Sequence, residues 1–117
     1  MSKKYKFTGE EKTIRVGKEN REITVKRIIA LTDFFDVAAG DLGGWIQFKS
    51  NLSQKGNCWV YDDSCVCEGA RVFDDSIIDY GAVVCGKAKI SETAKVSGVK
   101  IGGNSVLNGV SKIQGEE

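Results

Sequence analysis

The fold is decided by a run of short repeats that is clearest in residues 58–97, CWVYDDSCVCEGARVFDDSIIDYGAVVCGKAKISETAKVS. An aliphatic residue recurs every six positions, and the series continues after one corner that is a residue short. Its members are Val60, Val66, Val72, Ile78, Val84, Ile90, Val96, Ile101, Leu107 and Ile113. Small residues stand two positions before those from Val66 to Val96, namely Ser64, Ala70, Ser76, Ala82, Ala88 and Ala94.

Each unit of six residues is typical of a short β-strand followed by a corner. Residues two apart in a strand share a face, so the small and the aliphatic residue point inward together. The residues on either side of the aliphatic one point outward. Turn formers such as Asp62 and Asp63, or Gly86 and Lys87, occupy the corners. An α-helix is excluded, because its faces repeat about every 3.6 residues.

This period resembles that of the left-handed hexapeptide β-helix family, in which three units form one triangular coil. The resemblance covers roughly residues 56–115. It implies a fold without implying an activity, since one fold carries many functions. We therefore expect an all-β protein built on a left-handed parallel β-helix of about three coils.

The first part of the chain has a different pattern. Residues 5–8, 12–16 and 22–31 look like strands, with a turn that begins at Gly17. We expect a small antiparallel N-terminal sheet that caps the β-helix, because an end coil exposes core and unpaired backbone. Three glycines, Gly40, Gly43 and Gly44, are expected to have positive φ at a bend. The expected division is residues 1–50 for the N-terminal β module and 51–117 for the β-helix.

The composition restricts the possible chemistry. Of the 117 residues, 41% are hydrophobic and 28% are charged, and none is His. A serine triad, a histidine base and a histidine-ligated metal are therefore excluded. The polar N-terminus and the lack of a long apolar segment predict a cytoplasmic protein that binds no membrane. Its four cysteines are then expected to be thiols or metal ligands.

The cysteines are the candidate metal ligands. With three units per coil, residues eighteen apart lie on neighbouring strands about 4.8 Å apart. This spacing stacks Cys67 and Cys85, with Cys65 on the same outward side. Thiolates that close suit tetrahedral zinc, so we expect a structural zinc held by these three residues. The fourth ligand is open between a residue of the N-terminal module, water and Cys58, although the repeat points Cys58 inward. Unpaired thiols are the alternative to zinc.

Charge and aromatic residues predict a partner-binding surface. Residues 1–31 and 81–115 are basic, whereas residues 32–80 hold nine Asp or Glu against three Lys or Arg. The expected contact residues are the outward Trp59, Tyr61 and Ile77 and the corner residues Asp62, Asp63, Asp74 and Asp75. Two alternatives stay open: the N-terminal module covers the apolar patch, and the acidic residues are ordinary corner residues.

The junction between the two parts carries a second resemblance. Residues 41–46 (DLGGWI), 51–53 (NLS) and 56–61 (GNCWVY) resemble segments of phage and prophage proteins in which a short β module runs into hexapeptide repeats. The four cysteines depart from that pattern. The resemblance implies a non-enzymatic protein that inhibits a host defence nuclease, such as an anti-CRISPR protein that blocks DNA loading on Cas9 in the host cytoplasm. The acidic band would dock on the basic channel of Cas9 without direct contact to nucleic acid.

Two other functions stay open. One is a phage structural or assembly protein that forms a homodimer through its C-terminal edge. The other is an enzyme of the hexapeptide acyltransferase type, whose members generally rely on a His base. Because this sequence has no His, the non-enzymatic binding protein is the favoured interpretation.

Overall fold

The computed structural model describes residues 3–109 and 112–114, which form strands and one short 3₁₀ helix. Three longer strands come first: β1 (Tyr5–Val16), β2 (Arg21–Ala30) and β3 (Leu42–Ile46). The 3₁₀ helix η1 (Lys49–Asn51) follows them. The short strands are β4 (Trp59–Val60), β5 (Cys65–Val66), β6 (Arg71–Val72), β7 (Ile77–Asp79), β8 (Val83–Val84), β9 (Lys89–Ile90), β10 (Lys95–Ser97), β11 (Lys100–Ile101), β12 (Val106–Leu107) and β13 (Lys112–Gln114).

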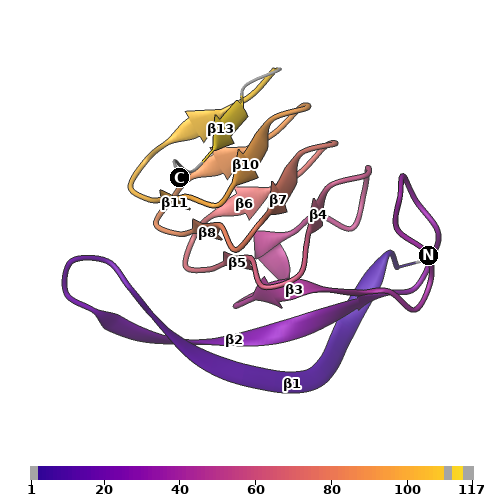
Figure 1. The fold of residues 1–117 in the computed structure, drawn as a ribbon, viewed down its shortest axis with the longest axis horizontal. Coiled ribbons are helices and arrows are strands. Elements are labelled where there is room, and N and C mark those ends of the chain that lie inside the picture. Colours follow the sequence, from indigo (N-terminus) through magenta and orange to yellow (C-terminus); the bar gives the residue numbers. More distant parts are fainter. Residues whose placement is uncertain (1–2, 110–111, 115–117) are drawn as a thin grey trace.

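The short strands stack into a parallel β-solenoid with three sides (Figure 1). One side stacks β3, β5, β8 and β11, the second β4, β7, β10 and β13, and the third β6, β9 and β12. The predicted fold class is confirmed. The solenoid has about four turns rather than three, because β3 and the bridge from Leu52 to Val72 already belong to its first turn.

The register of the strands follows the repeat. Val66 pairs with Val84, eighteen residues further on. After the shortened corner at Gly98, where φ is 66°, the spacing becomes seventeen, as between Val84 and Ile101. The sequence repeat thus predicts which residues are neighbours in successive turns.

The core lies inside the solenoid and is supplied by the repeat itself. The aliphatic residues from Val60 to Val96 are 0–1% exposed, and the small residues before them are fully buried. Of the two polar small residues, Ser76 donates its hydroxyl to the carbonyl oxygen of Phe73 at 2.7 Å, whereas the buried Ser64 hydroxyl has no hydrogen-bond partner among the described residues. Small and aliphatic side chains together fill the narrow interior.

Two glycines in β3 allow close packing against the first turn. A Cβ at Gly43 would lie 2.6 Å from the Trp59 ring, and one at Gly44 would lie 2.5 Å from the carbonyl oxygen of Ser64. Neither glycine has positive φ, so the reason expected for them is wrong. Only Gly40, with φ of 95°, fits that expectation.

The N-terminal module is a long hairpin that continues into the solenoid. β1 and β2 pair antiparallel, with a bulge between Phe7 and Glu11. β3 pairs antiparallel with β2 and parallel with β5, so one sheet runs from the hairpin onto a side of the solenoid. Figure 1 shows the hairpin lying along the stacked turns. β3 belongs to both parts, and the expected division after residue 50 stays a prediction.

Aromatic residues and one lysine cover the N-terminal end of the solenoid. Trp59 packs edge-on against Tyr5 and Phe34, with ring centroids 6.2 Å and 5.1 Å away. The buried Lys4 ammonium lies 5.0 Å from the Phe34 ring and donates to the carbonyl oxygen of Cys58 at 2.7 Å. Burial lowers the pKa of Lys4. The predicted cap is therefore formed by packed side chains as well as by strands.

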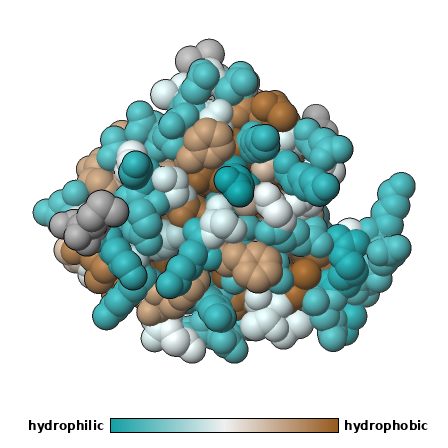
Figure 2. Space-filling model, turned by 180° about the vertical axis from the view of Figure 1, so that it is seen from behind, coloured by the Kyte–Doolittle hydropathy of each residue, from teal (hydrophilic) through white to brown (hydrophobic). Residues whose placement is uncertain are grey.

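Polar side chains dominate one face of the molecule (Figure 2). Figure 2 shows a face on which hydrophilic residues predominate and hydrophobic ones are scattered. In the part of the chain that the structure describes, no helix is long and apolar enough to cross a membrane. The expected homodimer through the C-terminal edge stays a prediction, and part of that edge, residues 115–117, lies outside the described residues.

Neighbouring residues on opposite faces of β7 test the inward arrangement. Ile78 is fully buried, whereas Ile77 faces outward. We expect Ile78→Ala to lower the free energy of unfolding by about 2–5 kcal/mol. For Ile77→Ala the expected loss is about 1 kcal/mol or less. Urea unfolding followed by far-UV circular dichroism measures both, and equal losses would contradict the arrangement.

Candidate functional site

Three cysteines come together on the side of the solenoid that the hairpin covers. Cys65 opens β5, Cys67 follows it, and Cys85 comes directly after β8, which pairs with β5. The backbone N–H of Cys67 donates to the carbonyl oxygen of Val84 at 2.9 Å, which sets Cys67 beside Cys85, and the thiol of Cys85 donates to the carbonyl oxygen of Ile101 at 3.6 Å. Cys65 and Cys67 are 3% and 0% exposed, whereas Cys85 is half-buried. Of the three, Cys85 is the thiol that solvent reaches.

The hairpin covers these thiols with apolar side chains. Val16 and Val25 pack with Trp45, Cys65 and Cys67 in a cluster separate from the solenoid core. This second cluster explains why the outward cysteines are buried although they do not point into the solenoid.

Burial raises the pKa of all three thiols. The pKa of Cys67 rises from 9.0 to about 12, through desolvation first and the neighbouring Cys85 second. Burial also raises the pKa of Cys65 and of Cys85. Arg21 and Lys100 act in the opposite direction at Cys85. At neutral pH these residues are therefore thiols rather than thiolates.

The expected zinc site at Cys65, Cys67 and Cys85 stays a prediction. Among the described residues, no group of three or more Cys, Asp or Glu side chains is arranged to hold a metal ion. Cys58 lies apart from the other cysteines in the solenoid core, where its Sγ accepts from Lys4 Nζ at 3.3 Å.

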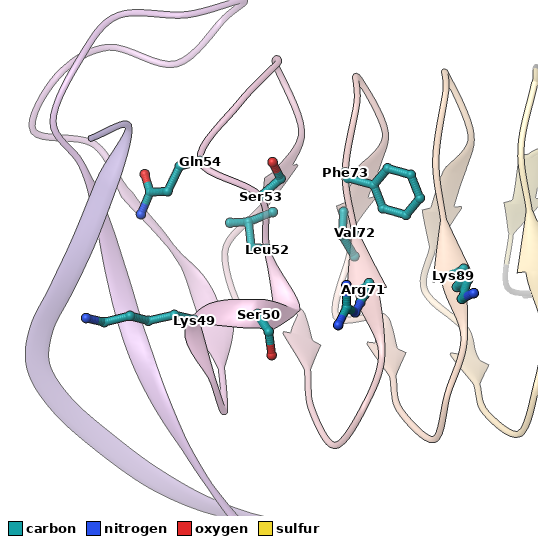
Figure 3. A pocket seen from close by; sticks show the side chains of 9 residues that line it. All are labelled: Lys49, Ser50, Leu52, Ser53, Gln54, Arg71, Val72, Phe73 and Lys89. Atoms are coloured by element: carbon teal, nitrogen blue, oxygen red, sulfur yellow. The ribbon is translucent and has the colours of Figure 1, made fainter. Parts of the chain in front are cut away.

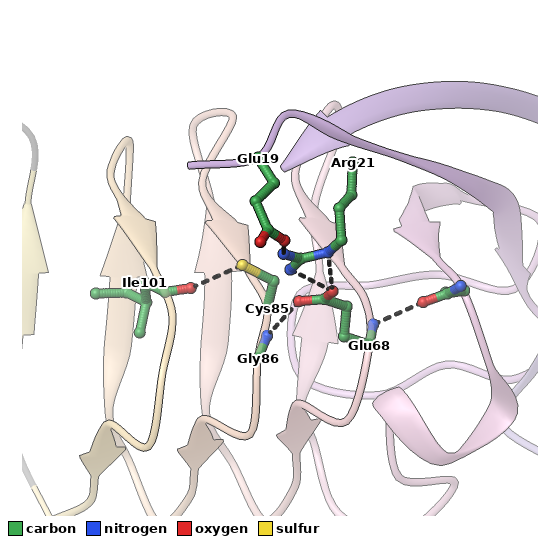
Figure 4. A network of polar contacts seen from close by, with 7 residues as sticks. Glu19, Arg21, Glu68, Cys85, Gly86 and Ile101 are labelled. Carbon is green, nitrogen blue, oxygen red and sulfur yellow. Dashed lines mark hydrogen bonds and ion pairs between the residues drawn. The ribbon is translucent and has the colours of Figure 1, made fainter. Parts of the chain in front are cut away.

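A polar network fastens the hairpin to the solenoid beside the thiols (Figure 4). Glu68 accepts from Arg21 Nη2 at 2.6 Å and from the backbone N–H of Gly86 at 2.9 Å. Arg21 also pairs with Glu19 at 3.2 Å. The hydrogen bond from Arg21 is the main reason why the pKa of Glu68 is lowered. Sequence reasoning missed Glu68, because its partner is distant in the chain.

The predicted partner surface is largely occupied by the N-terminal module. Trp59 is 1% exposed, so a partner reaches it only if the segment over it moves. Tyr61 and Ile77 are half-buried, and the Tyr61 hydroxyl donates to Asp36 at 2.6 Å. A role of these residues in binding a partner stays a prediction.

The acidic corner residues Asp62, Asp63, Asp74 and Asp75 are exposed. Asp62 and Asp74 have positive φ, 54° and 62°. The carboxylates of Asp74 and Asp75 accept backbone N–H groups of Glu92 at 3.0 Å and of Asn57 at 3.1 Å. These residues therefore shape corners, and their contact with a partner stays a prediction.

Two adjoining pockets form a groove where η1 meets the third side of the solenoid. The first has a volume of about 450 Å³ and is lined by Lys49, Arg71 and Lys89, which Figure 3 shows on η1 and on successive strands. The second, of about 430 Å³, shares Lys49 and adds Lys3 and Lys6. We call the two together the basic groove, after these five cations.

The cations of the basic groove are free to bind an anion. None of the five forms an ion pair with another described residue. Arg71 and Lys89 are both exposed and are register partners on β6 and β9. Ser50 and Ser53 add hydroxyl groups, and the half-buried Phe73 adds an aromatic ring.

A third pocket lies between the hairpin tip and the solenoid. It has a volume of about 700 Å³, and we call it the hairpin pocket. The hairpin side of its lining is Arg15, Val16, Gly17, Lys18 and Asn20. The solenoid side is Val83, Cys85, Lys100, Ile101, Gly102 and Gly103. The thiol of Cys85 is thus part of a cationic and partly apolar wall.

Comparison with known proteins gives one clear relationship. No family model matches the chain. The chain is 33% identical over 98 residues to a protein of Escherichia coli (strain K12) named Uncharacterized acetyltransferase YdcK. The aligned part is 82% of this chain but only 27% of that relative, so the chain spans about a quarter of its length.

This relationship contradicts the expectation that the protein is not an enzyme. The name of the relative points to an enzyme family, and it agrees better with the acyltransferase alternative. The missing histidines were given too much weight, since they exclude imidazole chemistry and not acyl transfer as such. Neither the comparison nor the fold supports a phage origin or the inhibition of Cas9.

The raised thiol pKa values predict a loss of stability at alkaline pH. Cys67 contributes stability that is complete below its unfolded pKa of 9.0 and is lost as the pH rises toward the folded value of about 12. We expect the urea midpoint to fall between about pH 9 and pH 11, and to fall less steeply in Cys67→Ala. Lys4 contributes to the pH dependence of stability with the opposite sign, because its pKa is lowered in the folded state. This contribution is the same in the wild type and in Cys67→Ala.

Val83→Ala is the matched control, because it removes apolar atoms from the same cluster without removing a thiol. The urea midpoint of Val83→Ala should fall with pH as steeply as that of the wild type. If the urea midpoint of Cys67→Ala falls with pH as steeply as that of the wild type, burial of this thiol does not control stability at alkaline pH.

Proposed function

We propose that the chain takes part in acyl transfer and binds the anionic part of a coenzyme A-type acyl donor in the basic groove. The observation that carries this proposal is the gathering of five cations without carboxylate partners among the described residues. The identity to a protein named an acetyltransferase supports the reaction type.

The arrangement of the cations favours a ligand with several phosphates. Like charges directly opposite each other on neighbouring strands repel, and this applies to Arg71 and Lys89. A phosphate between them removes the repulsion and accepts charge-assisted hydrogen bonds, which Arg makes in pairs. Lys49 joins the two pockets and extends the positive charge toward Lys3 and Lys6.

The remaining lining suits the nucleoside and the acyl arm of such a donor. Phe73 supplies a ring on which a base can stack, and stacking of this kind contributes about 1–3 kcal/mol. Leu52 and Val72 supply apolar wall. Neither pocket is lined by a carboxylate. The role assigned to the groove is therefore to bind and orient the donor, so that an acceptor with a free lone pair attacks its thioester carbonyl.

Titration calorimetry with acetyl-coenzyme A tests the proposal. We expect the wild type to bind it with an affinity that falls as salt rises, because the contacts are ionic. The double variant Arg71→Gln/Lys89→Gln should bind at least about tenfold more weakly, since a hydrogen bond to a charged group contributes about 1.5–3 kcal/mol.

Lys87→Gln is the matched control, because Lys87 is exposed at a corner of the same turn and lines neither pocket of the groove. Release of free coenzyme A in the presence of small amines reports the transfer itself. The proposal fails if the wild type does not bind acetyl-coenzyme A, or if the double variant binds it as tightly as Lys87→Gln.

A further inference from the structure

The corner that follows β5 holds a carboxylate that the corner after β8 lacks. Val66 and Val84 are register partners. Glu68 and Gly86 each come two residues later, so they hold equivalent positions in successive turns. One oxygen of the Glu68 carboxylate accepts the backbone N–H of Gly86 at 2.9 Å, and the other accepts from Arg21 at 2.6 Å (Figure 4). A single carboxylate thus joins a corner N–H group to a cation of the hairpin.

The chain cannot repeat this contact at the next turn. Val84 pairs with Ile101, so Gly103 is the equivalent of Gly86 there. Gly86 has no side chain that could accept the N–H of Gly103, and a Cβ at Gly86 would lie only 2.6 Å from the Gly103 nitrogen. Among the described residues, this N–H has no hydrogen-bond acceptor. The position that Glu68 fills in one turn is therefore open, in the next, to an acceptor from outside the chain.

The hairpin pocket surrounds this position with positive charge. Gly103 is exposed and lines the pocket, as do Arg15, Lys18 and Lys100. Within the described part of the chain, Lys18 and Lys100 form no ion pair, while Arg15 pairs with Glu22 at 2.9 Å. None of the described lining residues is Asp or Glu. The wall of the pocket thus combines a free N–H group with two unpaired ammonium groups.

We propose that the hairpin pocket binds an aliphatic monocarboxylate, whose carboxylate takes the place beside Gly103 that Glu68 takes beside Gly86. One carboxylate oxygen accepts the N–H of Gly103, and the other faces the ammonium groups of Lys18 and Lys100. Hydrogen bonds in which the acceptor is ionised are roughly twice as strong as those between neutral groups. The chemistry of the contact is the same as in the network of Glu68 and Arg21.

The apolar part of the lining favours a carboxylate with a hydrocarbon chain over a small inorganic anion. Val16 is buried, and Val83 and Ile101 are half-buried, in the wall of the pocket. The volume of about 700 Å³ is typical of sites for small organic ligands. A fatty acid of medium length places its chain along these three side chains, and the burial of apolar surface adds to its affinity.

The hairpin pocket is separate from the basic groove. Its solenoid wall comes from β8, β11 and the residues that follow them, whereas Arg71 and Lys89 of the basic groove are on β6 and β9, on another side. No described residue lines both sites. This proposal therefore does not rest on acyl transfer, and each site can be altered while the other stays intact.

Titration of the ¹⁵N-labelled full chain with octanoate at pH 7, followed by amide NMR spectra, tests the proposal. Octanoate should bind saturably and shift the amide proton of Gly103 downfield, because this N–H gains an acceptor. The amide of Gly86 is the internal reference, since Glu68 already accepts it. Acetate and inorganic phosphate should bind at least about tenfold more weakly, because they lack the hydrocarbon chain. Octylamine has the same chain with the opposite charge and should leave the Gly103 amide unchanged.

Two double variants test the role of the cations. Lys18→Gln/Lys100→Gln should weaken octanoate binding at least about tenfold, since each removes a charged partner of the carboxylate. Arg71→Gln/Lys89→Gln is the matched control, because it removes two positive charges from another side of the solenoid. It should bind octanoate as the wild type does.

Three results would overturn the proposal. The first is a Gly103 amide that octanoate does not shift, the second is acetate or phosphate binding as tightly as octanoate, and the third is equal octanoate affinity in the two double variants. The first two are measured on the unaltered chain, so they decide the proposal even if a variant fails to fold.

Discussion

The structure depends on one constraint, which is that each turn of the solenoid must bury a small and an aliphatic residue on every side. Interiors are close-packed, so the turns stack in register at the spacing of neighbouring β-strands. Every outward side chain then has a fixed neighbour in the next turn. Cys67 lies beside Cys85, and Arg71 beside Lys89, for this reason.

The N-terminal hairpin determines which outward side chains of the solenoid stay accessible. On one side it covers the outward cysteines with Val16 and Val25, and Arg21 fastens it to Glu68. Only Cys85 remains partly open there, in the hairpin pocket. On another side, β1 brings Lys6 toward Lys49 and so lengthens the basic groove beyond the solenoid itself. Both candidate sites therefore lie where the N-terminal hairpin or η1 contacts the repeats of the solenoid.

That division also separates what the sequence could predict from what it could not. The fold and the stacking of Cys67 on Cys85 follow from a period that is visible in the sequence. The burial of Cys65 was not predictable, because the hairpin that covers it has no sequence period relating it to the solenoid. Lys49 was missed for the same reason, since η1 lies outside the repeats. The expectation that the protein is not an enzyme treated the absence of His as the absence of catalysis, and it is contradicted by a relative that is named an acetyltransferase.

Methyl–methyl nuclear Overhauser effects test the central constraint most directly, because they report which inward side chains touch. The account predicts contacts from Val66 to Val84, eighteen residues apart, and from Val84 to Ile101, seventeen apart across the shortened corner. It also predicts none from the methyl groups of the fully buried Val66 and Val84 to Val16 or Val25, which belong to the outer cluster. Loss of the first two contacts, or contacts from Val84 to the hairpin, would contradict the inward stacking on which both sites depend.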